Sequence, residues 1–371
     1  MSQRNTPPYR ADHVGSLLRP QRLAEARLAF QAGDLDGADL RAVEDDCIQG
    51  AVRMQEAAGL KSITDGEFRR TAWQWDFLSG FEGMEFREQS FGPGFSSGRA
   101  PGTTFVTGQI SNPSGVMLDD FRFLQETTTQ TAKFCIPAPS LAYHRGGRGA
   151  IEAPAYDDLD LFWDDVLAAY EAQIEFLSEM GCTYLQLDDT TFAMLCDAKV
   201  RGAMTERGDD VDDLIRRYAA NIQRLAAAKP DTMALTVHMC RGNSQSSWIA
   251  EGGYEAVAEA LFSDVRVDGL FMEWDSDRAG DFEPLRFVPK GQVVVLGLIT
   301  SKFPELEDSD DIKRRLDEAA RYVDMDDLCL SPQCGFASTH HGNKLTEDEQ
   351  RRKLDLVVEL ADDIWGRGIN S

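Results

Sequence analysis

Residues 159–188 read LDLFWDDVLAAYEAQIEFLSEMGCTYLQLD and contain one complete helix-and-strand unit of the kind that recurs along the chain. Apolar side chains recur at helical spacing from Leu159 to Met180, which predicts an amphipathic helix. Asp157 and Asp158 precede this helix as N-cap candidates, and Gly181 follows its last turn. The stretch therefore predicts a helix that begins and ends at definite residues.

A buried strand is expected directly after this helix. The run Thr183–Leu187 is short and apolar, and the polar Asp188 follows it. The same alternation of long helical patterns with short apolar runs continues on both sides. The other strand candidates are His13–Leu17, Ser62–Thr64, Thr104–Ile110, Phe134–Pro137, Ala234–His238, Gly269–Met272, Val293–Gly297 and Cys329–Ser331. The other helix candidates are Leu40–Ala58, Val211–Ala228, Tyr254–Phe262, Ser309–Tyr322 and Thr346–Trp365.

Strands that alternate with helices form parallel βαβ units, and about eight such units close into a TIM-type (β/α)8 barrel. We therefore expect an α/β fold in which residues 1–371 form a single catalytic barrel domain. One strand candidate is left over, and we place Thr104–Ile110 in an accessory hairpin within an insertion at about residues 84–112. A Gly-, Pro- and Ser-rich loop at 90–103 lies beside it. A doubly wound open sheet is the competing topology, but its usual Gly-rich phosphate loop does not occur early in the sequence.

The composition argues against several classes of function. The 371 residues carry a net charge of −25, which repels nucleic acid and anionic membrane surfaces. The sequence has no apolar run of about 18 residues, and its N-terminus lacks the apolar core of a signal peptide. The seven cysteines are scattered and odd in number, unlike a disulfide framework. We expect a cytoplasmic protein with no nucleic-acid or membrane partner.

Polar side chains stand at the carboxyl ends of the predicted strands, and in a β/α barrel these ends converge on one mouth. The residues concerned are Ser16, Glu67, Asp188, His238, Cys240, Glu273 and Cys334. Because strand side chains alternate, His238 and Cys240 point the same way and are able to chelate one metal ion. The structural alternative for this pair is a hydrogen-bonded histidine beside a buried cysteine.

Glu273 and Cys334 complete a donor set for zinc. A buried glutamate needs a partner, and zinc binds one imidazole, two thiolates and one carboxylate in a tetrahedron. Zinc with these ligands carries a net charge of about −1, which suits it to hold a substrate thiol as a nucleophilic thiolate. The expected chemistry is attack of that thiolate on an electrophilic carbon, with Glu273 moving aside. A structural zinc has the same ligands but has no need of a barrel mouth.

Six short motifs occur here in the order in which a known family has them. They are ADHVGS at 11–16, DGE at 65–67, LQLD at 185–188, HMC at 238–240, the strand before Glu273, and PQCG at 332–335. From about Asp12 to Trp365, the chain resembles the C-terminal catalytic domain of cobalamin-independent methionine synthase in a short "core" form. The resemblance implies a β/α barrel, a Zn²⁺ ion and methyl transfer to the sulfur of L-homocysteine in methionine synthesis.

The resemblance also implies roles for single residues. The implied zinc ligands are His238, Cys240, Glu273 and Cys334. The residues implied to bind homocysteine are Val14, Gly15, Ser16, Glu67 and Asp188. Two carboxylates suit an ammonium group, so Glu67 and Asp188, which we also expect to be catalytic, are assigned to the amino group. A backbone N–H and the hydroxyl of Ser16 suit the substrate carboxylate.

Three questions stay open at the level of sequence. The methyl donor is a folate, a methylcobalamin protein or another methylated compound. The acceptor is homocysteine or another thiol, as in an epoxide:coenzyme M transferase, which needs cationic groups for a sulfonate. The third question is whether the protein is an enzyme or a non-enzymatic zinc scaffold. The side chains with two or more open interpretations are Arg69, Arg70, Trp73, Trp75, Lys302, His340 and His341.

Overall fold

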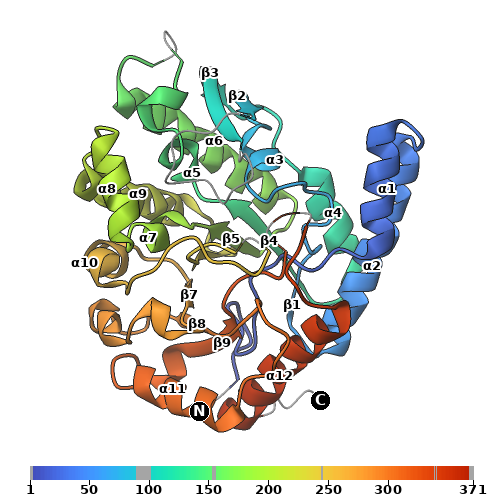
Figure 1. The fold of residues 1–371 in the computed structure, drawn as a ribbon, viewed down its shortest axis with the longest axis vertical. Coiled ribbons are helices and arrows are strands. Elements are labelled where there is room, and N and C mark those ends of the chain that lie inside the picture. The colour runs from blue at the N-terminus through green and yellow to red at the C-terminus, as the bar shows by residue number, and fades with distance from the viewer. Residues whose placement is uncertain are drawn as a thin grey trace.

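Seven parallel strands form a curled sheet with the longer helices packed around its outside (Figure 1). This computed structural model describes residues 3–88, 102–152, 156–243, 245–337, 339 and 341–366. The spatial order of the strands is β1-β4-β5-β6-β7-β8-β9. Their bounds are β1 Ser62–Ile63, β4 Thr131–Pro137, β5 Tyr184–Asp188, β6 Ala234–Met239, β7 Gly269–Glu273, β8 Val294–Ile299 and β9 Leu328–Pro332. The parallel α/β architecture of a TIM-type barrel is confirmed.

Several of the longer helices begin at a residue whose side chain caps the first turn. Asp158 accepts a hydrogen bond from the backbone of Asp160 at the start of α6, and Gly181 lies just beyond its end with a φ of 85°. Thr346 and Glu349 form a reciprocal capping box at α12. The longer helices are α1 Gln21–Ala32, α2 Gly37–Ala57, α4 Leu118–Thr127, α6 Leu159–Glu179, α8 Ala198–Glu206, α9 Val211–Ala228, α10 Glu255–Asp264, α11 Ser309–Ala319 and α12 Glu347–Trp365. The short helices are α3 Trp75–Leu78, α5 Leu141–His144 and α7 Thr191–Met194.

The N-terminal segment, residues 9–17, occupies the eighth position of the barrel between β9 and β1. On one side, Ala11 forms a parallel bridge with Leu330 of β9. On the other side, the backbone N–H of Leu17 donates to the carbonyl of Gly66, 3.1 Å away, just beyond β1. The segment therefore spans the opening between the first and last strands of the sheet.

The predicted strand His13–Leu17 is not formed, although the segment lies where that strand was expected. Side-chain hydrogen bonds take the place of backbone hydrogen bonds between strands. Asp12 accepts from the backbone N–H of His13 at 2.8 Å, and Thr64 Oγ1 donates to the carbonyl of Gly15 at 2.6 Å. Gly15 also has a φ of 135°, which a regular strand does not contain. Local side-chain bonds of this kind compete with a backbone ladder.

A buried ion pair joins this segment to the interior of the barrel. Lys133 Nζ of β4 lies 3.1 Å from Asp12 Oδ1, and both side chains are fully buried. The same carboxylate accepts hydrogen bonds from Ser62 Oγ at 2.8 Å and from Tyr184 OH at 2.9 Å. The pair thus connects the N-terminal segment to β1, β4 and β5, and fixes the turn that follows it.

An antiparallel hairpin lies outside the parallel sheet, on the side of the molecule away from the two termini (Figure 1). It consists of β2 Glu82–Arg87 and β3 Thr103–Ser111, so Thr104–Ile110 is confirmed as part of an accessory hairpin. Most of the predicted loop at 90–103 lies outside the described residues, and the insertion bounds of 84–112 and the single-domain organisation stay predictions. Among the described residues, no helix has the length and apolar character needed to cross a membrane.

Candidate metal and substrate site

The carboxyl ends of the barrel strands surround one pocket of about 130 Å³. Seven of the residues predicted at the barrel mouth or in the substrate turn line this pocket. They are Val14, Ser16, Glu67, Asp188, His238, Cys240 and Cys334. Gly15 and Glu273 are not among the described lining residues. Most, though not all, of the residues predicted at the carboxyl ends of the strands therefore lie together in one pocket.

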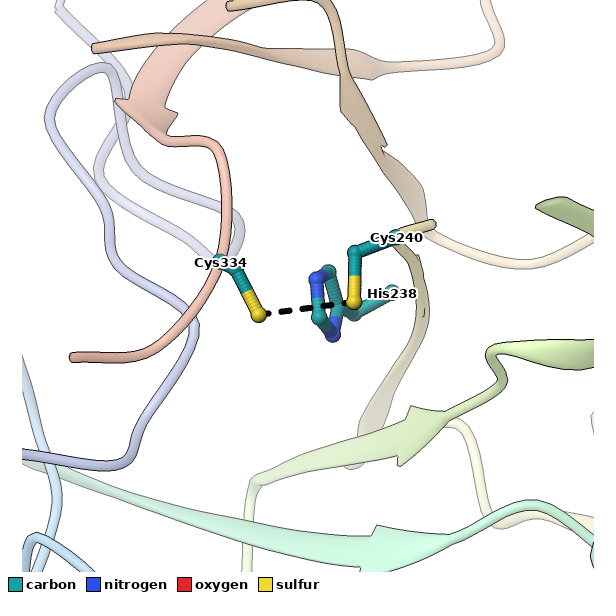
Figure 2. Close-up of side chains that lie close together, drawn as sticks. All are labelled: His238, Cys240 and Cys334. Atoms are coloured by element: carbon teal, nitrogen blue, oxygen red, sulfur yellow. Dashed lines mark hydrogen bonds between the residues drawn. The ribbon is translucent and has the colours of Figure 1, made fainter. Parts of the chain in front are cut away.

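The side chains of His238, Cys240 and Cys334 converge in this pocket (Figure 2). Their candidate ligand atoms all lie within 4.8 Å of one another, and the two sulfurs are 3.4 Å apart. A tetrahedral zinc ion places neighbouring N and S ligands roughly 3.3–3.8 Å apart, given its usual bond lengths. The three residues are therefore close to zinc-binding geometry without a large rearrangement.

The histidine is oriented as a metal ligand. Asp188 and His238 are direct neighbours across β5 and β6, and Asp188 Oδ1 lies 3.0 Å from His238 Nδ1. The other ring nitrogen, Nε2, is buried and has no hydrogen-bond partner among the described residues. A carboxylate on one nitrogen and an unsatisfied second nitrogen facing two thiols is the arrangement that histidine ligands of zinc adopt. The residues present fit a zinc ion.

The electrostatics favour deprotonation of one thiol before any metal binds. Hydrogen bonding from Cys240, with a further contribution from His238, holds the pKa of Cys334 well below its usual value despite burial. The same contact with Cys334, together with burial, raises the pKa of Cys240. Burial alone would lower the pKa of His238, but the nearby carboxylate of Asp188 and the sulfur of Cys334 raise it to about 10. Metal binding at this site is therefore expected to release protons.

Glu273, the predicted fourth ligand, is not part of the cluster that His238, Cys240 and Cys334 form. It is fully buried at the end of β7, where its carboxylate accepts from the backbone N–H of Arg241 and forms an ion pair with Arg278. Lys302 Nζ lies a further 3.7 Å from Glu273 Oε1. Arg241 directly follows Cys240, so the carboxylate is close to the ligand loop but bound to other groups. Its role as a zinc ligand stays a prediction.

Glu67 lies in an unusual backbone conformation. Its φ is 60°, in the left-handed region that costs a glutamate about 1 kcal/mol or more, and its N–H is bonded to Asp65 Oδ1 at 2.8 Å. Burial raises its pKa to about 7, and the charge of nearby Arg70 opposes this shift while that of Asp188 adds to it. One carboxylate oxygen, Oε2, is buried without a partner among the described residues. The loop thus presents an unsatisfied carboxylate to the pocket.

The Val14-Gly15-Ser16 turn is packed too tightly for a larger residue at its centre. A Cβ on Gly15 would lie 2.7 Å from Cys135 Sγ, at a φ that side chains rarely adopt. Gln186 Nε2 donates to the carbonyl of Val14 at 2.6 Å. These contacts fix the position at which Ser16 enters the pocket.

The side chains with open interpretations separate into two groups. Trp73 and Trp75 line the pocket, whereas Arg69 forms ion pairs with acidic residues of α2 and α4, outside it. Arg70 is buried beside Glu67 and donates to a backbone carbonyl. His341 is exposed, and His340 lies outside the described residues. Neither arginine lines the pocket.

Arg145 and Asn243 are two of the polar lining residues that were not anticipated from the sequence. Arg145 follows α5, eight positions after the end of β4, and Asn243 follows Cys240 by three. Neither residue stands at a strand end or within a recognised motif, so the strand-end pattern gives no signal for either of them. A search of every βα loop for cations would have found Arg145.

The fold and the pocket are those of an established enzyme family. Residues 11–363 match the catalytic domain of the cobalamin-independent synthase family, and the chain belongs to that family. The protein is therefore a methyltransferase.

Individual relatives agree with this assignment. The chain is 46% identical over 367 residues to the uncharacterised protein YxjG of Bacillus subtilis, covering 98% of this chain and 96% of the relative. It is 23% identical to a methionine synthase of Pyrococcus abyssi over 324 residues, 87% of this chain and 85% of the other. The structure of a candidate vitamin-B12-independent methionine synthase from Listeria monocytogenes superposes with a TM-score of 0.78 at 37% identity, covering 98% of this chain and all of that one.

Proposed function

We propose that the protein transfers a methyl group to the sulfur of L-homocysteine, forming methionine, with a zinc ion held in the barrel mouth. The observation that carries the proposal is a single pocket lined by His238, Cys240 and Cys334 and by the carboxylates Glu67 and Asp188. A zinc ion bound there would supply a substrate thiolate at neutral pH. The named activities of the relatives agree with this acceptor.

The chain's own residues orient the amino acid. Glu67 offers an oxygen that lacks a partner among the described residues, and Asp188 lies in the same pocket, so the two together receive an ammonium group. Ser16, held by the turn before it, is positioned for the substrate carboxylate. Asp188 has a second task, because its Oδ1 also holds the ring of His238. The thiol end of the substrate is then directed toward Cys240 and Cys334.

The reaction balances without an oxidant or reductant. The homocysteine thiol releases its proton to the solvent on binding, and the sulfur electron pair forms the new bond to the methyl carbon. The bond between that carbon and the donor breaks, and the donor leaves with its electrons. Burial of the inner residues excludes water, which would otherwise compete for the methyl group.

The test is product formation by the zinc-loaded protein. L-Homocysteine is supplied with 5-methyltetrahydrofolate in one arm and methylcobalamin in another, and methionine is quantified. Methionine formation in either arm that is lost in Cys334→Ser supports the proposal and identifies the donor. A second thiol, 2-mercaptoethanesulfonate, is supplied in parallel with an epoxide. Turnover of that pair alone would establish the epoxide:coenzyme M type of reaction in its place.

A further inference from the structure

The pocket has an inner and an outer zone that differ in burial. The inner zone contains the buried residues Ser16, Glu67, Asp188, His238, Cys240 and Cys334. The outer zone contains the half-buried residues Trp73, Trp75, Arg145 and Thr190. A ligand in the inner zone is contacted from the outer zone. A second substrate that reacts with it therefore binds in the outer zone.

Arg145 is the single arginine or lysine among the described residues that line the pocket. Its guanidinium lies over the ring of Trp75, 5.8 Å from the ring centroid. The side-chain amide of Gln74 has one orientation in which both its oxygen and its nitrogen are satisfied. In that orientation the oxygen accepts hydrogen bonds from Arg145 Nε at 3.2 Å and from Arg145 Nη2 at 3.1 Å. The same oxygen accepts from Trp75 Nε1 at 3.1 Å. The guanidinium is therefore held in one orientation by neutral groups.

No described acidic side chain forms an ion pair with Arg145. Burial lowers the pKa of Arg145 to about 10, and no carboxylate counteracts that shift. This is notable in a chain with 63 acidic and 38 basic residues, in which other arginines, Arg69 and Arg207 among them, do have acidic partners. A guanidinium that is oriented but has no counter-charge is a site for an anion from outside the chain.

The charge of the inner zone decides which substrate supplies the anion. The carboxylates of Glu67 and Asp188, which line the inner zone, repel an anion from it, apart from the turn at Ser16 proposed for the amino acid. Arg145 is the remaining cationic position, and it lies farther out. An anionic group on the second substrate is attracted there, while its reactive end faces inward.

We propose that the outer zone is the subsite of the methyl donor, and that Arg145 binds an anionic group of that donor. The inference rests on the proposed function, because it assigns the inner zone to homocysteine. It also sets the order of binding: the thiol enters first, and the donor then covers it. The donor class is one that carries a carboxylate or phosphate on the part remote from the methyl group.

The probe is a pair of aromatic compounds that differ in charge alone, para-fluorobenzoate and para-fluorobenzamide. Each is titrated by fluorine NMR against zinc-loaded protein already saturated with L-homocysteine, so that the carboxylate position in the inner zone is filled. We expect the benzoate to bind about tenfold more tightly than the benzamide, as a charge-assisted hydrogen bond provides. Arg145→Gln should remove this preference, and Arg145→Lys should keep part of it.

The control separates this inference from the function on which it rests. Homocysteine affinity is measured by calorimetry in the same variants, and it should change less than twofold in Arg145→Gln. Equal binding of the two probes, binding of neither, or a preference that survives in Arg145→Gln would overturn the donor subsite. A loss of homocysteine affinity in Arg145→Gln with no change in probe binding would also overturn it, because Arg145 would then bind the amino acid.

Discussion

Replacing Asp188 with asparagine should damage two functions at once, because this carboxylate orients a metal ligand and lines the substrate pocket. Its Oδ1 lies 3.0 Å from His238 Nδ1 and also accepts from Gln186 Nε2 at 2.7 Å. An asparagine oxygen is still able to accept from the imidazole but without charge, and its amide group adds a donor near Gln186. The ring of His238 is then held less firmly.

The size of each effect follows from the contact that is lost. Loss of a carboxylate that orients a zinc-binding histidine usually lowers metal affinity about 10–100-fold, or roughly 1.4–2.8 kcal/mol. Loss of a charged partner for the substrate ammonium costs about 1.5–3 kcal/mol, so homocysteine affinity should fall by at least about tenfold. Glu67→Gln is the matched control, because the described contacts of Glu67 do not include His238. It should lower homocysteine affinity to a similar extent and leave zinc affinity within twofold.

Zinc affinity is measured by competition with a chromophoric chelator, and homocysteine affinity by calorimetry on protein loaded with zinc to saturation. Circular dichroism confirms that both variants are folded. The reasoning is refuted if Asp188→Asn binds zinc as tightly as the unmodified protein, or if Glu67→Gln weakens zinc binding to the same degree.

Three further predictions follow from the described contacts. Cys334→Ser should lose zinc, measured as bound metal per chain, and full occupancy would remove this residue from the ligand set. Glu67 has a pKa of about 7, so below pH 7 its carboxyl group is mostly protonated and must lose a proton before it can receive the ammonium group. Homocysteine affinity should therefore fall more steeply toward low pH in the unmodified protein than in Glu67→Gln. Parallel pH profiles of the two proteins would contradict that role. Lys133→Met leaves Asp12 buried with four neutral hydrogen-bond donors and no counter-charge. The free energy of unfolding, measured by urea titration, should therefore fall by about 3 kcal/mol. An unchanged urea midpoint would show that the ion pair does not stabilise the barrel.

Local patterns in the sequence predicted most of the barrel. Helix periodicity with clear caps located Val211–Ala228 without error and Leu159–Met180 to within one residue. The helix α1 was missed because its apolar residues do not recur on one face, and β2 was missed because its burial is irregular. The N-terminal segment was misassigned as a strand because the side-chain bonds of Asp12 and Thr64 are not visible in an apolar pattern.

The candidate site was predicted by a topological rule, and its omissions have a physical cause. Strand ends in a barrel converge, so residues such as His238 and Cys334 could be grouped without knowledge of their distances. Side-chain direction was beyond that rule, and Glu273 therefore lies at the expected strand end while its carboxylate turns toward Arg278. Arg145 was overlooked because it stands in a loop, where sequence does not show which way a side chain points.

The central claim is that the barrel mouth binds homocysteine through its sulfur and its amino-acid end together. The most direct measurement is a calorimetric titration of zinc-loaded protein with L-homocysteine in buffers of different ionisation enthalpy, run beside 2-mercaptoethanesulfonate. The account predicts tight binding of homocysteine with about one proton released, and much weaker binding of the sulfonate. Equal or tighter binding of the sulfonate, or homocysteine binding without proton release, would contradict it.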